Sequence, residues 1–431
     1  MAPLTQSICI RGASPLSTQK HIFRFCRKGR PMSTVPASGS PRAASSAQTG
    51  ALAVHTGTTI AVLAASSALV PLYRLYQAAW HFSPVMLTLI FASYVLALLA
   101  TLMIAGSLSD HIGRRPALTL ALGLNIVAMG VFLVAGSPTV LLVARLVQGV
   151  ATGIATATLA ATLLDLHQER GALINSVAPM TGMAVGALGS AVLVDTTPFG
   201  SVFVLLLVVF CLNLGLTWRM PETVRRRPGA LRSLRPRLVI PPGARAELLA
   251  ITPINVSIWA LGGFYLSLMP SLIAAVTGTQ TALLAGGNVA ALTLSGAAAI
   301  LVIRRHGPMV ALTAGGMALI VGLCVTLTGA NQGIASLLIV GSVIAGVGFG
   351  AGFSGAMRRL APLAAPHERA GLMAAFYVES YLANSLPTIL AGVLIPRLGL
   401  LAVTNLYGGA LIGLVGVGLL LTRMRHRRAL A

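Results

Sequence analysis

Long apolar stretches recur along almost the whole chain and are separated by short polar connections. Each has about 20 residues or more, the length that an α-helix needs to cross a hydrocarbon layer of roughly 30 Å. Because a helix satisfies its own backbone hydrogen bonds, the repetition predicts an all-α membrane protein of twelve transmembrane helices and not a barrel. The stretches lie near residues 54–73, 84–108, 117–136, 138–164, 171–194, 200–219, 247–276, 281–303, 309–329, 333–357, 370–395 and 400–422.

The connection after the sixth stretch is the longest and divides the stretches six and six. The first residues are rich in Ser, Arg, Ala and Pro and contain no acid. Such a segment cannot bury a core, so it predicts a disordered tail, in which Met32 is an alternative start. The predicted parts are this tail over 1–50, a six-helix bundle over 51–219, a basic cytoplasmic linker over 220–246, a second six-helix bundle over 247–422 and a basic cytoplasmic tail over 423–431.

The composition agrees with a lipid environment. Of 431 residues, 56% are hydrophobic and 9% are charged, whereas soluble domains carry about 25% charged residues. The net charge of +22 does not indicate nucleic acid, because the arginines of the connections gather on one side; the other side holds Arg74 and Arg397. This asymmetry predicts a multi-pass protein of the inner (plasma) membrane with both termini in the cytoplasm.

The sequence indicates neither an enzyme nor a cofactor-binding protein. Its four cysteines have no pairing or ligand spacing, so we expect no disulfide framework and no metal site. The absence of a G-x-x-x-x-G-K-[ST] motif argues against ATP-driven pumping. We expect a monomer in a lipid bilayer with a small-molecule substrate, no nucleic acid partner, no cofactor, and a proton gradient as the candidate energy source.

The most specific motif is the turn between the second and third stretches. Its pattern is G-x-L-x-D-(basic)-x-G-R-(basic), and its specified residues include Gly106, Asp110, Gly113, Arg114 and Arg115. This pattern resembles the signature of the major facilitator superfamily at the junction of its second and third helices. The resemblance implies a fold of two six-helix pseudo-repeat bundles and a transport function for about residues 54–424.

Two interpretations of this turn are open. As the resemblance implies, Asp110 stabilises the positive N-terminus of the eleventh helix, near residues 370–371, and so latches the inner gate. Arg114 then pairs with Asp110, and Gly106 allows a neighbouring helix to approach closely. Alternatively, the turn is a topology anchor with no moving part.

Glycine spacing predicts close helix packing. A Gly-x-x-x-Gly pair of the fourth helix reappears 199 positions later in the tenth, as expected for the parallel half-repeats of such transporters. The fifth-helix glycines resemble a motif of proton-driven drug exporters, but Ala187 replaces its proline, which favours packing over an antiporter role. Residues 221–223 (Pro-Glu-Thr) also resemble an exporter tripeptide, with a helix stop as the alternative. The predicted packing glycines are Gly149, Gly153, Gly182, Gly186, Gly189, Gly348 and Gly352.

Two charged residues lie inside apolar stretches. Arg145, with Gln148 one turn later, lies within the fourth stretch, where a charge is costly and marks a functional site. The resemblance implies proton or substrate handling; the alternative is an arginine held by neighbouring carbonyls. Glu379 is about nine residues, or roughly 14 Å, into the eleventh helix. Loss of water favours its neutral form and would let it exchange protons; the alternative is one structural hydrogen bond between helices.

The leading hypothesis is a secondary active transporter that moves small organic molecules across the inner membrane by alternating access. Efflux of rather apolar molecules is the favoured direction. One alternative is uptake of a metabolite such as an organic acid, with Arg145 as the partner of its carboxylate. A receptor or scaffold without transport is another. The predicted cavity residues are Ser67, Asn255, Trp259, Asn288, Phe353, Tyr377, Tyr381 and Asn384.

Overall fold

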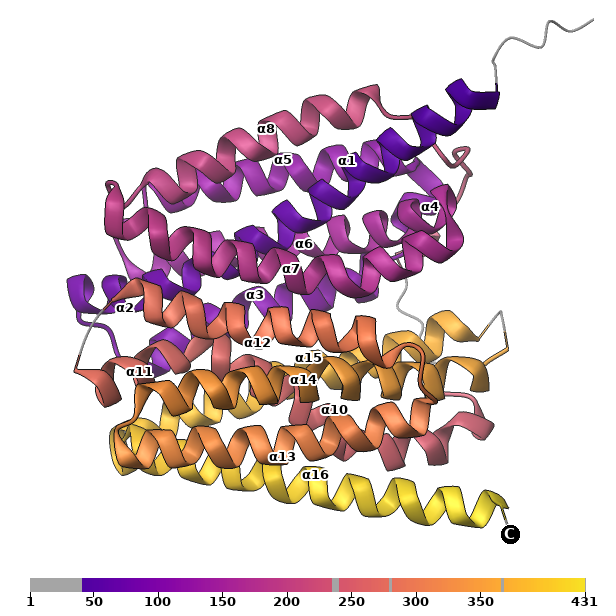
Figure 1. Cartoon of the computed structure of the whole chain (residues 1–431). Helices are drawn as coiled ribbons and strands as arrows, with labels where there is room; N and C mark the ends of the chain where they lie inside the picture. Colours follow the sequence, from indigo (N-terminus) through magenta and orange to yellow (C-terminus); the bar gives the residue numbers. More distant parts are fainter. Residues whose placement is uncertain (1–40, 235–239, 279–280, 366–367, 431) are drawn as a thin grey trace, which may run out of the picture. The chain divides into compact units, whose positions relative to one another are not determined.

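The computed structural model describes residues 41–234, 240–278, 281–365 and 368–430, which form helices and connections without any strand (Figure 1). In this part of the chain, twelve helical spans are long and apolar enough to cross a membrane, which confirms the predicted fold class. The helices are α1 (Pro41–Ser67), α2 (Leu69–Trp80), α3 (Pro84–Ala105), α4 (Leu108–Ile112), α5 (Arg114–Leu133), α6 (Pro138–Leu166), α7 (Gln168–Thr196), α8 (Ser201–Arg219), α9 (Ala230–Ser233), α10 (Pro242–Ser267), α11 (Met269–Thr277), α12 (Ala282–Ile303), α13 (Pro308–Gln332), α14 (Ala335–Leu360), the 3₁₀ turn η1 (Ala361–Leu363), α15 (Arg369–Leu398) and α16 (Leu400–Leu430).

The first and seventh spans are each broken into two helices, where the sequence predicted one continuous stretch. The first breaks at Ala68 and the seventh at Leu268. A proline follows each break, Pro71 in α2 and Pro270 in α11. Proline removes a backbone donor and clashes with the carbonyl four residues earlier, which favours an interruption there, although α7, α10 and α15 continue through internal prolines. The two prolines are 199 positions apart, the same offset as the glycine repeat.

The element ends differ from the predicted domain bounds at three places. Residues 41–50 lie in α1 and not in a disordered tail, because Pro41 is acceptable at a helix start and alanines follow it; residues 1–40, with Met32, lie outside the described residues. The linker contains α9, and α10 already begins at Pro242. The predicted C-terminal tail continues α16 to Leu430.

The first six spans (residues 48–219, the first half) meet the last six (242–425, the second half) mainly through the pairs α3/α15 and α7/α12. Small residues allow the close approach: a Cβ at Gly286 would overlap the carbonyl of Ala187, and one at Gly392 would overlap the hydroxyl of Thr88. Residue contacts group residues 45–431 into one unit and do not divide it into the two predicted six-helix bundles. The bounds of these bundles therefore stay predictions.

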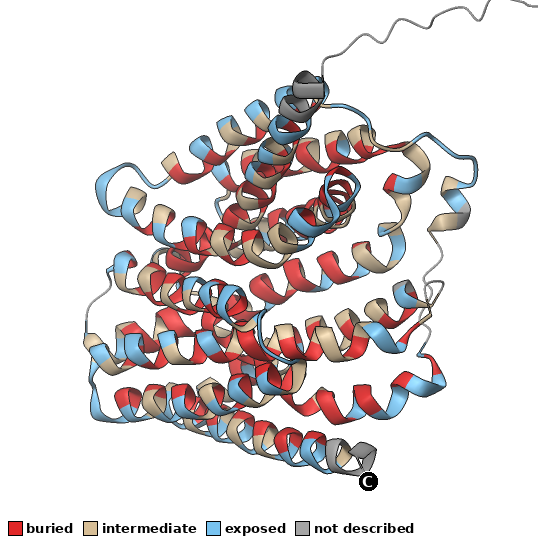
Figure 2. Cartoon of the chain, turned by 45° about the vertical axis from the view of Figure 1, so that its right-hand side comes forward, coloured by how far each residue is buried: buried red, intermediate tan, exposed pale blue. Residues whose placement is uncertain are grey.

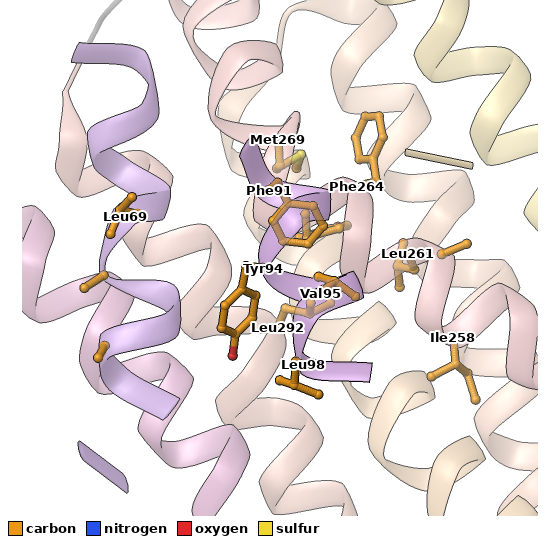
Figure 3. Close-up of a cluster of buried hydrophobic side chains, with 14 of the residues drawn as sticks. Leu69, Phe91, Tyr94, Val95, Leu98, Ile258, Leu261, Phe264, Met269 and Leu292 are labelled. Carbon is orange, nitrogen blue, oxygen red and sulfur yellow. The ribbon is translucent and has the colours of Figure 1, made fainter. Parts of the chain in front are cut away.

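The buried core is continuous across the two halves. Figure 2 shows that the helices carry buried residues along their length. In the close-up of Figure 3, Tyr94 and Val95 of α3 belong to the same cluster as Leu261 and Phe264 of α10. Large apolar side chains are also exposed, such as Leu212, as expected where lipid surrounds the protein.

The helices have two ends that differ in charge. We call the end with α4, the connection between α6 and α7 and the start of α10 the arginine-rich end, because the arginines of the described connections lie there. The other, the opposite end, holds the short connections after α2, α11 and α15. Arg74 and Arg397 lie toward this end.

Candidate functional site

An ion-pair network holds the turn between α3 and α5 at the arginine-rich end. The guanidinium of Arg114 donates to the carboxylates of Asp110, 2.5 Å away, and Asp165, 3.1 Å away. Asp165 lies near the end of α6 and also accepts a hydrogen bond from Oγ1 of Thr223 at 3.1 Å. The network therefore connects α4, α5 and α6 within the first half.

Glu222 caps the N-terminus of α5. Its carboxylate accepts hydrogen bonds from the backbone N–H groups of Arg114 (2.8 Å) and Arg115 (2.9 Å), where the helix dipole favours negative charge. Gly113 turns the chain at a φ of 100°, and a Cβ there would approach Oε2 of Glu222 to 2.9 Å. The tripeptide 221–223 is thus part of the turn network and not merely a helix stop. The sequence did not reveal these partners, because Glu222 is more than 100 residues from the turn.

Asp110 does not make the predicted contact with the eleventh helix, α15, in this conformation. Its side chain is 52% exposed, and among the described residues its ion pair is with Arg114. The prediction that Gly106 packs on a neighbouring helix is wrong, because a Cβ there would meet the carbonyl of Leu102 in its own helix α3. A latch on α15 stays a prediction for another conformation.

Arg145 is buried in α6, with 1% of its surface exposed. Its guanidinium donates to the hydroxyl of Tyr73 (3.0 Å from Nε), the carbonyl of Ser66 (2.9 Å) and Oε1 of Gln148 (2.7 Å). Gln148 donates to the carbonyl of Ala65 at 3.0 Å. Both carbonyls lie just before the break between α1 and α2. The break therefore supplies acceptors that a continuous helix would use for its own N–H groups.

No acidic side chain pairs with Arg145 within the described ranges. Instead, the rings of Tyr73 and Tyr94 lie 5.4 Å and 5.1 Å from its guanidinium carbon, which is within the range of cation–π attraction. Neutral dipoles and aromatic faces thus surround the charge. A buried cation without a counter-charge makes its neighbourhood favourable for an anion.

Glu379 is half-buried between α15 and α10. Oε2 accepts a hydrogen bond from Thr252 at 2.9 Å, and Oε1 accepts one from Nδ2 of Asn255 at 3.0 Å. Nδ2 of Asn255 also donates to Ser380 at 3.0 Å. A hydroxyl can donate to a carboxylate or accept from a carboxylic acid, so Thr252 is compatible with both protonation states of Glu379.

An aromatic cluster brings together four of the predicted cavity residues. Trp259 of α10 lies 4.9 Å from Tyr381 of α15 and 6.2 Å from Phe353 of α14, measured between ring centroids, and Tyr377 lies 6.2 Å from Tyr381. All four side chains are half-buried. In the described part of the chain, Nε1 of Trp259 is buried without a hydrogen-bond partner.

Other predicted cavity residues are structural. Ser67 is 1% exposed and donates to the carbonyl of Met183 at 2.8 Å, which joins α1 to α7. Asn288 is equally buried and bonded to Ser342 of α14. In this conformation both side chains bond within helix contacts, and their assignment to the cavity stays a prediction. Asn384 is buried and donates to the carbonyl of Trp259 at 3.0 Å.

The predicted packing glycines lie against neighbouring helices, with one exception. A Cβ at Gly189 would meet nothing within 4 Å, so the packing prediction is wrong there. At the other six positions a Cβ would meet another helix at less than 3 Å. These are Gly149 and Gly153 against α3, Gly182 and Gly186 against α1, Gly348 against α13 and Gly352 against α10.

Comparison with known proteins agrees with this architecture. A sequence profile of the Major Facilitator Superfamily matches residues 56–378, more than half of the chain. The chain belongs to the Major Facilitator Superfamily. It is therefore a multi-pass membrane protein of a transporter family. A comparison with curated protein sequences found no significant match.

Solved structures of transporters share the fold. A mutant of the nucleoside transporter NupG has a TM-score of 0.68 and 11% identity, over 86% of this chain and 99% of NupG. A POT family transporter in complex with 5-aminolevulinic acid has a TM-score of 0.67 and 14% identity, over 87% of this chain and 94% of that one. A POT family transporter with a thioalcohol-conjugated peptide has a TM-score of 0.69 and 15% identity, over 87% and 96%. At these identities the likeness concerns the fold alone.

Proposed function

We propose that this superfamily member is a secondary active transporter that exports small, planar and largely apolar organic molecules by alternating access. The observation that carries the proposal is the aromatic cluster of Trp259, Phe353, Tyr377 and Tyr381. Flat rings provide stacking surfaces for a planar substrate. The ligand sites of transporters of this type lie between their two halves.

Polar groups of the cluster are available to orient such a substrate. Nε1 of Trp259 is a donor without a partner, and among the described residues the hydroxyls of Tyr377 and Tyr381 have none either. Ligand pockets combine apolar walls with a few uncommitted polar groups, and this cluster fits that description. The substrate class is thus a planar molecule with hydrogen-bond acceptors at its edge.

Two features support export as the direction of transport: the orientation of the protein in the membrane and the ion-pair network of the turn between α3 and α5. The excess of arginine at one end supports a cytoplasmic location for that end. The Pro-Glu-Thr tripeptide, which resembles one in drug exporters, caps α5 there through Glu222.

Glu379 is the proposed site of proton exchange, because its hydrogen bonds are to neutral donors and it has no basic partner among the described residues.

Uptake of an organic acid is the second candidate. It is favoured by Arg145, which is buried without an acidic partner in the described structure and lies near the aromatic face of Tyr94. A substrate carboxylate would supply the missing counter-charge. This candidate reverses the direction of transport and replaces the apolar substrate with an anion.

Vesicle transport distinguishes the two candidates. Everted and right-side-out vesicles with the protein are offered a panel of planar heteroaromatic molecules and small organic acids under an imposed pH gradient. We expect everted vesicles to accumulate a heteroaromatic molecule at least tenfold more than vesicles without the protein. Accumulation of an organic acid in right-side-out vesicles would establish uptake instead, and no transport of any panel member would contradict both.

A variant pair tests the aromatic cluster. Trp259→Ala should raise the KM for the exported molecule at least tenfold, because it removes the ring that contacts both Tyr381 and Phe353. Trp218→Ala is the matched control: Trp218 is 59% exposed on α8, and its removal should leave the KM unchanged. Equal effects of the two substitutions would exclude the cluster as the substrate site.

A further inference from the structure

A cavity of about 240 Å³ lies at the opposite end, apart from the aromatic cluster. Helices of both halves form its walls: Arg74 and Gln77 come from α2, Pro84 and Leu87 from α3, Ser271 from α11 and Ile395 from α15. α2 and α11 contact each other there. The cavity therefore depends on the association of the two halves at this end.

Arg74 is the charged residue of this cavity. One terminal amino group of its guanidinium donates to Oε1 of Gln77 at 3.0 Å, and Nε2 of Gln77 donates to the carbonyl of Phe82 at 3.1 Å. These bonds fix the orientation of the guanidinium. Its Nε is buried and has no hydrogen-bond partner, and no acidic side chain in the described chain pairs with it. Arg74 is thus an oriented cation with unused donors in a partly apolar cavity.

We propose that this cavity binds a small monocarboxylate through Arg74. The two terminal amino groups of a guanidinium match the two oxygens of a carboxylate, and such paired hydrogen bonds are strong. Pro84, Leu87 and Ile395 form an apolar surface for a short chain or a single ring. The volume is below the 300–1,000 Å³ of typical drug-sized pockets, so the ligand is about the size of benzoate.

Occupation of this cavity holds the opposite end closed. A bound monocarboxylate contacts both halves, so it binds tightly only to the conformation in which α2 and α11 are together, and it shifts the population toward that conformation. This consequence rests on the proposed transport function: a monocarboxylate on this side inhibits transport. Binding itself does not depend on transport.

Benzoate is the probe, and protection of a cysteine is the measurement. In the full chain with Cys9, Cys26, Cys211 and Cys324 replaced by alanine, Ser271→Cys places a thiol in the cavity wall. Benzoate should slow its reaction with a maleimide at least fivefold. Benzamide, which has the same ring and no charge, should not slow the reaction at the same concentration and ionic strength.

Two arginine variants separate a built site from general charge attraction. Arg74→Gln should abolish the protection. Arg397→Gln removes the same charge from an exposed residue near the same end that does not line the cavity, and it should keep the protection. Equal protection by benzamide, or protection that survives Arg74→Gln, would overturn the proposal.

If the cysteine variant does not fold, calorimetric measurement of benzoate binding tests the proposal instead. Benzoate should bind the unsubstituted protein, and Arg74→Gln should weaken this binding at least tenfold. No heat of binding to the folded protein would overturn the site. If binding is present but vesicle transport is absent, the proposed function fails while the site stands.

Discussion

Arg145 is a buried cation that the protein surrounds with neutral groups. It reaches Tyr73 on α2, the carbonyl of Ser66 on α1 and Gln148 in its own helix. Of the three partners, Ser66 supplies a backbone carbonyl, as the second interpretation of the sequence expects, and the described residues give the charge no counter-charge. Arg145 therefore positions α6 against the break of the first span.

The hydroxyl of Tyr73 should account for a measurable part of this attachment. Tyr73→Phe removes an acceptor from a buried charged donor, and we expect the free energy of unfolding in detergent to fall by about 1–3 kcal/mol. Tyr76→Phe is the matched control, because Tyr76 is also buried in α2 but contacts the rings of Trp80 and Phe199. Equal losses in the two variants would contradict the role of Tyr73.

Glu379 should control the pH dependence of transport. Glu379→Gln keeps a side chain that can bond Thr252 and Asn255 but cannot exchange a proton. We expect the variant to fold and to lose the dependence of substrate flux on the pH gradient. Asp195→Asn, at the exposed end of α7, is the control and should retain that dependence. A flux of Glu379→Gln that still follows the gradient would make Glu379 structural.

The sequence predicted that these two charged residues lie deep in the bundle, but it did not predict their hydrogen-bond partners. An apolar stretch around Arg145 or Glu379 predicts depth in the bundle, but Tyr73 is 72 residues from Arg145 and Thr252 is 127 from Glu379. Tyr377 and Tyr381 lie two residues on either side of Glu379 in the sequence. Residues two apart on a helix point in different directions, and both tyrosines join the aromatic cluster instead.

Helix contacts in this protein depend on individual glycines. On α7, a Cβ at Gly186 would overlap the carbonyl of Ala64, whereas one at Gly189 would meet nothing within 4 Å. Two glycines three residues apart in one helix therefore have different packing requirements. Which glycine packs depends on the rotation of α7 against α1, and that rotation was not readable from the spacing alone.

This difference gives a prediction for α7. Gly186→Ala should separate α1 from α7 and lower the apparent melting temperature by several degrees, because the new methyl group meets backbone that cannot move alone. Gly189→Ala should leave the melting temperature unchanged or raise it, since alanine is up to about 1 kcal/mol more favourable in a helix. Thermal unfolding in detergent measures both, and a larger loss for Gly189→Ala would contradict the described packing.

The helices themselves were predicted in number and order from apolar length, because the bilayer sets that length. Their interruptions were not, although Pro71 and Pro270 were visible in the sequence. A proline within a membrane helix is tolerated when other groups satisfy the freed backbone. Here Gln148 and Arg145 bond the carbonyls of Ala65 and Ser66 near the first break. Such partners become visible only in three dimensions.

At the scale of the whole molecule, the two halves are joined by tight contacts near the opposite end, including Thr88 against Gly392. The described ion pairs at the arginine-rich end, by contrast, stay within one half each: Arg114 pairs in the first half, and Glu247 pairs with Arg359 and Arg425 in the second. We therefore expect transport to require separation of the halves at the opposite end.

A reversible cross-link between Thr88→Cys and Gly392→Cys tests this requirement most directly. A Cβ at Gly392 would lie 3.1 Å from Cβ of Thr88, so the two helices must part by a few tenths of an ångström to reach the 3.5–4.5 Å of a disulfide. In a chain without other cysteines, oxidation should reduce substrate flux in vesicles at least tenfold, and reduction should restore it, while each single variant stays insensitive to oxidation. Undiminished flux through the fully cross-linked protein would contradict alternating access.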